Sequence, residues 1–153
     1  MRIVLLAGAV LTGMLLVACG DDDEEGGGGG NEVNVTLQEY SVNPDADSAG
    51  AGEVTFNVEN KGPDEVHEFV IIKTDLKPDA LPTNDDGSAN EDAAGLEAID
   101  EIEDIPVGET QTLTVDLDAG KYVMICNIVE EPDGETEGEA HYEQGMRAAF
   151  TVE

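Results

Sequence analysis

The feature that most constrains the fold is a set of short segments in which apolar and polar residues alternate. Residues 33–37 read VNVTL, residues 54–58 read VTFNV and residues 113–117 read LTVDL. Alternation of this kind is typical of β-strands that bury one face. Further strands are predicted over residues 67–73, 122–128 and 148–152. The dense apolar run FVII at residues 69–72 favours a more fully buried strand.

Turn signals separate these segments and indicate an all-β sandwich or barrel. They are the sequences NKGP at residues 60–63, PVG at 106–108 and DAG at 118–120. The exception is the long acidic stretch from Asp75 to Asp104, which is punctuated by proline and glycine. We expect it to be an irregular insertion that contains either a short helix over residues 93–102 or an edge strand over residues 99–105.

The N-terminal segment has the features of an export signal. Arg2 precedes an apolar run over residues 3–17 that is too short and wrongly flanked for an ordinary transmembrane helix. The run ends in LVACG, which resembles a bacterial lipobox and implies cleavage before Cys19 and lipidation of its thiol. We therefore predict a signal peptide over residues 1–18 and an extracytoplasmic protein anchored to the membrane by lipid.

Five acidic residues and five glycines follow Cys19, over residues 21–30. Like charges repel one another and glycine has no strong conformational preference, so residues 19–31 are predicted to be a flexible tether. The predicted folded domain then spans residues 32–153.

The charge balance limits the choice of partners. The chain has 36 acidic and 6 basic residues and a formal net charge of −30. Nucleic acid is excluded as a partner, because phosphate binding needs a basic surface. The charge is compatible with a heavily solvated surface or with redox partners that have a basic docking face, and we expect the protein to be a monomer.

The scarce residue types carry the chemical signal. The chain has two histidines, His67 and His141, and two cysteines, of which Cys19 is assigned to lipidation. Cys126 is then a lone thiol at the end of a predicted strand, and Met146 follows five residues after His141. Two imidazoles, a thiolate and a weak thioether are the ligand set of a blue-copper site. Met124 is the competing sulfur, and its spacing from Cys126 places it on the core face of the strand.

These segments resemble the cupredoxin family of single-domain blue-copper proteins over roughly residues 32–153. The similar parts are NKG before HEF at residues 67–69, GKY before Cys126, and the H-x4-M turn before AFTV at residues 149–152. The resemblance implies a Greek-key β-sandwich with one type 1 copper ion near one end. It implies His67, Cys126 and His141 as ligands, Met146 as the axial ligand, and Asn127 and Ile128 beside them.

The sequence departs from the family between two of these ligands. Fourteen residues separate Cys126 from His141, where the family has only a few. The extra stretch is acidic, with proline and glycine, which indicates a solvated excursion that loop-closure entropy tolerates. Glu131 stands where the family's histidine would stand at the usual spacing, and it is the alternative ligand in place of His141.

The resemblance implies one-electron transfer between redox proteins. Two alternatives stay open: a copper-handling lipoprotein that delivers or scavenges the ion, and a metal-free binding module that keeps only the sandwich. An enzyme is not expected, because multicopper oxidases and copper nitrite reductases need more than two histidines.

Overall fold

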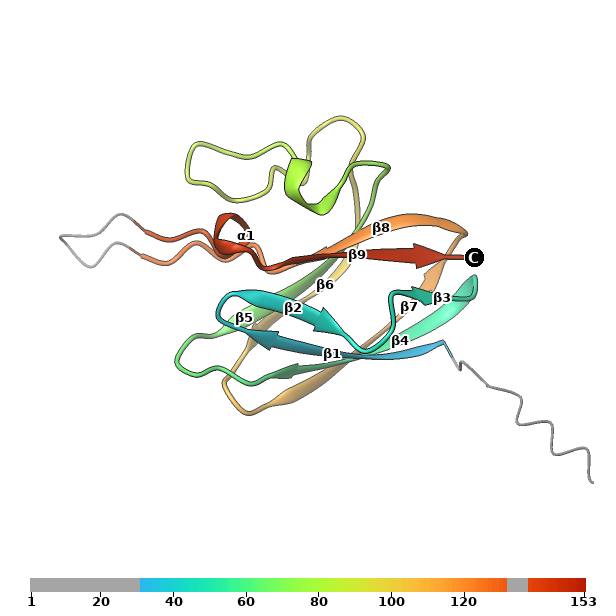
Figure 1. Ribbon diagram of the computed structural model, residues 1–153, viewed down its shortest axis with the longest axis horizontal. Coiled ribbons are helices and arrows are strands. Elements are labelled where there is room, and N and C mark those ends of the chain that lie inside the picture. The colour runs from blue at the N-terminus through green and yellow to red at the C-terminus, as the bar shows by residue number, and fades with distance from the viewer. Residues whose placement is uncertain (1–30, 132–137) are drawn as a thin grey trace, which may run out of the picture.

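The computed structural model describes residues 31–131 and 138–153, which form two packed β-sheets (Figure 1). One sheet has the strand order β2-β1-β4-β7 and the other has the order β3-β9-β8-β5-β6. The strands are β1 Glu32–Gln38, β2 Ser41–Pro44, β3 Ser48–Ala49, β4 Gly52–Asn60, β5 His67–Lys73, β6 Glu97–Ile105, β7 Thr110–Leu117, β8 Gly120–Ile125 and β9 Arg147–Val152. The two helical segments are the 3-10 helix η1, Pro78–Ala80, and the short helix α1, His141–Gln144.

The chain crosses repeatedly between the sheets, and the predicted Greek-key sandwich is confirmed. β1 pairs with β4 and β3 with β9 in parallel, whereas the other strand pairs are antiparallel. Each strand predicted from alternation is present, although β8 ends at Ile125 rather than continuing to Ile128.

The main core lies between the sheets and follows from the alternation. Val33, Val35 and Leu37 of β1 are buried, whereas the residues between them are exposed or half-buried. Phe56 lies at the centre of the sandwich, and its ring centroid is 5.3 Å from that of Phe69 and 5.5 Å from that of Phe150. Met124 belongs to this core as predicted.

A second apolar cluster lies outside the main core. Val70 and Ile72 of β5 and Val123 and Ile125 of β8 pack there with Leu81, Ala89 and Tyr142. Leu81 and Ala89 belong to the acidic insertion, which therefore covers the second face of these strands. This explains the dense apolar run in β5, because a strand buried on both faces has no solvent-facing positions.

The insertion itself is mostly irregular, and one of its two predicted alternatives is wrong. The helix over residues 93–102 does not form. Instead β6 pairs with β5 at the edge of the five-stranded sheet, as the alternative prediction over residues 99–105 required. The five acidic residues of β6 suit an exposed edge strand, since like charges discourage pairing with another chain.

Four elements were not predicted: the short edge strands β2 and β3, the 3-10 helix η1, and α1, which has a single turn. The predicted signal peptide, Cys19 and the tether up to residue 30 lie outside the described residues. Within residues 31–131 and 138–153, no helix is long and apolar enough to cross a bilayer.

Candidate metal centre

Strand register brings the predicted ligands to one end of the sandwich. β5 and β8 run antiparallel with Val70 opposite Ile125, so His67 at the start of β5 lies near Cys126 just after β8. β9 pairs with β8 with Arg147 opposite Ile125, which puts Met146 at the same end. The last predicted ligand, His141, begins α1 in the loop between β8 and β9.

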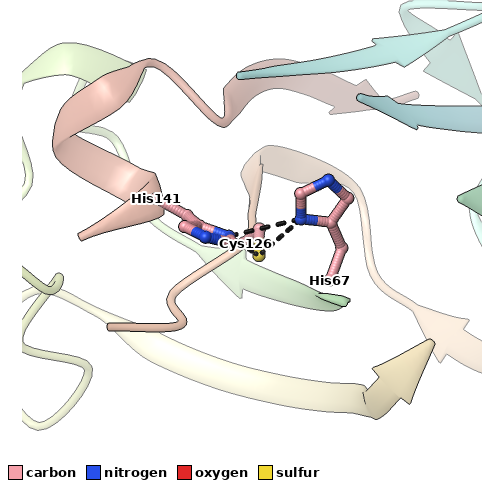
Figure 2. A group of neighbouring side chains, drawn as sticks. All are labelled: His67, Cys126 and His141. Atoms are coloured by element: carbon pink, nitrogen blue, oxygen red, sulfur yellow. Dashed lines mark hydrogen bonds between the residues drawn. The ribbon is translucent and has the colours of Figure 1, made fainter. Parts of the chain in front are cut away.

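Three donor atoms converge in the interior (Figure 2). The Nδ1 atoms of His67 and His141 are 3.2 Å apart. The Sγ atom of Cys126 lies 3.3 Å from Nδ1 of His141 and 3.9 Å from Nδ1 of His67. All three side chains are fully buried, and they form a group whose spacing suits a single metal ion.

Backbone hydrogen bonds fasten the segments that carry the ligands. The amide of Cys126 donates to the carbonyl of Met146, and the amide of Met146 donates to the carbonyl of His141. The amide of Glu68 donates to the sulfur of Cys126 at 3.3 Å. Met146 is fully buried and is thus tied directly to two of the converging residues.

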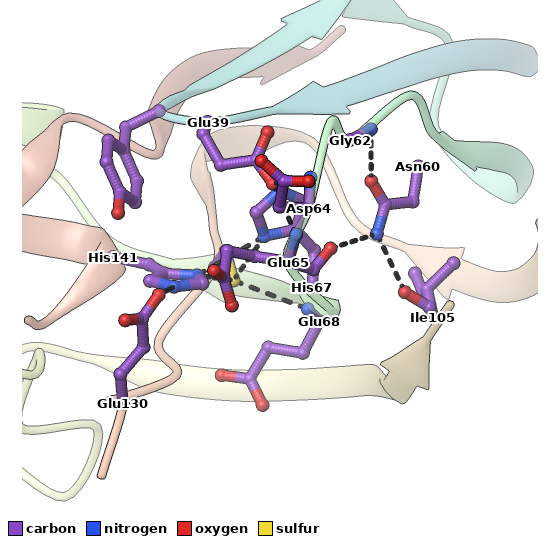
Figure 3. Close-up of polar contacts among 12 residues, drawn as sticks. Glu39, Asn60, Gly62, Asp64, Glu65, His67, Glu68, Ile105, Glu130 and His141 are labelled. Carbon is purple, nitrogen blue, oxygen red and sulfur yellow. Dashed lines mark hydrogen bonds and ion pairs between the residues drawn. The ribbon is translucent and has the colours of Figure 1, made fainter. Parts of the chain in front are cut away.

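Asn60, the last residue of β4, holds the chain before His67 (Figure 3). Its buried amide group donates to the carbonyls of Glu65 and Ile105 at 2.8 and 2.9 Å. Its side-chain oxygen accepts the amide of Gly62 at 2.7 Å. This explains why the NKG sequence precedes His67: the asparagine supplies the turn's hydrogen bonds from inside the protein.

Burial favours the neutral forms of Cys126 and His67. Burial raises the pKa of the Cys126 thiol to about 12, and two backbone amides lower it only in part. Burial, followed by the neighbouring His141, lowers the pKa of His67 to about 4, although Glu39 and Glu130 oppose this. Neutral imidazole is the form that binds metals, and a coordinated thiol loses its proton.

The residues fit a copper ion by their chemistry. The sulfur and the two imidazole nitrogens face one another without water-exposed atoms, in a shell of core residues. A cysteine with two histidines in such a shell is the ligand set of blue-copper centres. Burying polar atoms without full hydrogen bonding costs folding free energy. A metal ion bound by all three atoms would remove this cost.

The long loop after Cys126 returns to the site. Val129 and Ala140 form an isolated antiparallel bridge, and the amide of Glu130 donates to the carbonyl of Glu139. This pairing puts His141 beside His67 and Cys126, whereas Glu131, the alternative ligand, is exposed and outside the cluster.

The two residues expected beside the ligands support the loop. The carbonyl of Ile128 accepts the amide of His141. The Asn127 side chain accepts the amide of Ala89 and donates to its carbonyl, which ties the acidic insertion to the strand of Cys126.

Two carboxylates beside the histidines were not predicted. Oε1 of Glu130 lies 3.0 Å from Nε2 of His141, and Oε1 of Glu39 lies 3.8 Å from Nε2 of His67 (Figure 3). The ring of Tyr40 meets the ring of His141 edge-on, with centroids 5.4 Å apart. The sequence does not single out either glutamate, because they are two of 36 acidic residues in the chain.

Comparison with known proteins gives structural matches only. Neither a protein-family model nor a curated protein matches the chain. Auracyanin from the photosynthetic bacterium Roseiflexus castenholzii, in its dithionite-reduced form, is similar in structure, with a TM-score of 0.55 and 20% identity over 80% of this chain and 97% of that protein. Rusticyanin from Thiobacillus ferrooxidans matches with a TM-score of 0.51 and 17% identity over 81% of this chain and 79% of that protein.

Both structural relatives are cupredoxins. At this level of identity the likeness concerns the fold, and function must be argued from the site. The two-sheet architecture and the structural matches together show that this chain has the cupredoxin fold.

Proposed function

We propose that this protein is a blue-copper electron carrier that binds one type 1 copper ion. His67, Cys126 and His141 would be the strong ligands, and Met146 the weak axial ligand. The observation that carries the proposal is the buried convergence of two Nδ1 atoms and one sulfur at one end of a cupredoxin fold. Bound copper would supply a one-electron couple between Cu(I) and Cu(II).

The protein's part is to hold the ligands still while the charge of the site changes. The strand register and the bonds among Cys126, His141 and Met146 fix the donor positions from the backbone. A site that moves little between two oxidation states loses little energy to reorganisation, and this favours electron transfer over catalysis.

Burial of the site supports electron transfer over copper delivery. All four proposed ligands are fully buried, so release of an ion would require the protein to open locally. We expect slow release, which suits a resident cofactor better than cargo.

Voltammetry of the copper-loaded protein tests the function. We expect a reversible one-electron wave that is lost in Cys126→Ser, and copper that stays bound when a competing chelator is added. Rapid transfer of the copper to the chelator, with no reversible wave, would favour copper handling instead.

We also propose that the protein works outside the cytoplasm, anchored through a lipid on Cys19. Support comes from the sequence, where an apolar run of 15 residues, 3–17, ends two residues before this cysteine. Incorporation of a labelled fatty acid by the wild type but not by Cys19→Ala is the expected result. Equal labelling of both would contradict the anchor.

The partners proposed for this carrier are redox proteins with a basic docking face. Support comes from the net charge of −30, because opposite charge speeds encounter at low salt. The rate of electron exchange with a cationic redox protein should fall as salt is added, whereas the rate with an anionic one should rise.

A further inference from the structure

The histidines of the candidate centre each face a carboxylate on the side away from the other donors (Figure 3). Nε2 of His141 is 3.0 Å from Oε1 of Glu130, which is within hydrogen-bond distance. Nε2 of His67 is 3.8 Å from Oε1 of Glu39. We propose that Glu130 and Glu39 are positioning residues that fix the tautomer of both imidazoles and bias the bound ion toward Cu(II). This inference rests on the proposed copper site.

The contact with Glu130 determines which nitrogen of His141 carries the proton. A neutral imidazole has one N–H, and a carboxylate can only accept a hydrogen bond. The contact with Glu130 therefore holds the proton of His141 on Nε2. The Nδ1 lone pair is then free and points toward Cys126 and His67. Metal-binding histidines commonly have their second nitrogen fixed by an acceptor in this way.

His67 has the same arrangement with a longer contact. Its Nε2 and the Oε2 atom of Glu39 are buried and lack a hydrogen-bond partner among the described residues. The carboxylate of Glu39 is held in place, because its Oε1 accepts the amides of Asp64 and Glu65 at 3.1 and 2.6 Å. A small movement of the imidazole would let an N–H on Nε2 donate to this carboxylate, which would satisfy both buried groups.

The two carboxylates also bring negative charge close to the site. Within residues 31–131 and 138–153, no lysine or arginine forms an ion pair with Glu39 or Glu130. Two negative charges therefore lie one imidazole away from the proposed ion. Negative charge stabilises Cu(II) more than Cu(I), since the attraction grows with the charge of the ion. The carboxylates should thus lower the reduction potential.

The proposal gives the long loop after Cys126 a role, which is to carry Glu130 and hold it beside His141. Glu130 is in that loop, and the bridge between Val129 and Ala140 holds it against His141. Tyr40 closes the same side, as its ring lies against His141 and its hydroxyl donates to Glu139. His141 is consequently fully buried beneath these residues.

Reduction potentials of copper-loaded variants test the charge effect. Glu130→Gln keeps an acceptor oxygen and removes the charge. We expect it to weaken the preference for Cu(II) over Cu(I) about tenfold, which for a one-electron couple is an upward shift of about 59 mV. Glu39→Gln should shift the potential in the same direction. Glu131→Gln is the matched control, because it removes the same charge from the neighbouring exposed position and should cause a much smaller shift.

Equal shifts in Glu130→Gln and Glu131→Gln would overturn the inference, because the effect would then be one of net charge. A wild type that shows no thiolate–copper band would instead overturn the proposed function. These two failures are distinguishable, since the band is recorded on the same samples as the potential.

The tautomer is tested without any metal. Nitrogen NMR of the metal-free protein, at a pH above the ordinary histidine pKa of about 6.5, reports which ring nitrogen carries the proton. The chain has only two histidines, so the spectrum contains two imidazoles. We expect the N–H on Nε2 in both, and partial loss of this preference for His141 in Glu130→Leu but not in Glu130→Gln. An N–H on Nδ1 of His141 in the wild type would overturn the inference.

Discussion

At the scale of single residues, the site depends on what burial does to Cys126. A thiol with a pKa raised to about 12 is protonated at neutral pH. Such a thiol is a poor nucleophile, so the chain keeps a cysteine that is inert until a metal binds. Coordination must then displace the proton, which couples metal affinity to pH.

We therefore expect copper binding to release a proton from Cys126. At about pH 8, above the ordinary histidine pKa, addition of Cu(II) to the weakly buffered protein should release about one proton per bound ion. The affinity for Cu(II) should accordingly rise with pH throughout the range below the thiol pKa of about 12. Titration with a pH indicator measures the release.

The control is Cys126→Ser, which retains Cys19 and should release no proton at this site. Proton release from the wild type no greater than that from the variant would mean that the Cys126 thiol is already ionised, contrary to the effect of burial.

At the scale of elements, the end of β4 supports the start of β5. Asn60 satisfies two carbonyls and one amide from the interior, and it is fully buried. Removing such a group leaves buried polar atoms without partners, which costs more than the hydrogen bonds contribute.

We expect Asn60→Ala to lower the free energy of unfolding by about 3 kcal/mol and to weaken metal binding, because the segment before His67 loses its support. Urea unfolding of the metal-free protein measures the first effect. Asn57→Ala in the same strand is the matched control, since its side-chain hydrogen bonds are exposed, and it should cost less than about 1 kcal/mol. Equal losses in the two variants would show that Asn60 has no special role.

The elements also show what the sequence could predict. Alternation identified β1, β4 and β7, because each buries one face. β3 has two residues and α1 has four, which is too short for either pattern to be visible. The packing of the insertion over β5 and β8 depends on contacts distant in sequence, and only the apolar run at residues 69–72 indicated a covered face.

The candidate site also contains some residues that could be predicted from the sequence and others that could not. His67, Cys126 and His141 were predictable because histidine and cysteine are scarce in this chain and strand register brings them together. Glu39 and Glu130 could not be predicted, because acidic residues are common in this chain and only the folded structure brings these two beside the histidines. Met146 lies in the core at the expected end of β9, and its role as axial ligand remains a prediction.

At the scale of the whole molecule, the dominant property is charge. A net charge of −30 on 153 residues causes self-repulsion that opposes the compact state. Within the described part of the chain, lysines pair with exposed carboxylates only at Glu59, Asp75 and Asp118, so most of the negative charge is uncompensated.

Salt should therefore stabilise the folded protein. The Debye length falls from about 30 Å at 0.01 M salt to about 8 Å at 0.15 M, which screens the repulsion. We expect the thermal midpoint of the metal-free protein to rise by roughly 5 °C over this range, as measured by circular dichroism with sodium chloride. A midpoint that stays constant or falls would show that repulsion does not limit stability.

The most direct test of the proposed copper site is a visible absorption spectrum of the full chain after addition of one equivalent of Cu(II), beside Cys126→Ser. We predict an intense thiolate-to-copper band in the wild type and no such band in the variant, which still contains Cys19. A wild type without the band, or a variant that retains it, would contradict the assignment of His67, Cys126 and His141 as a blue-copper centre.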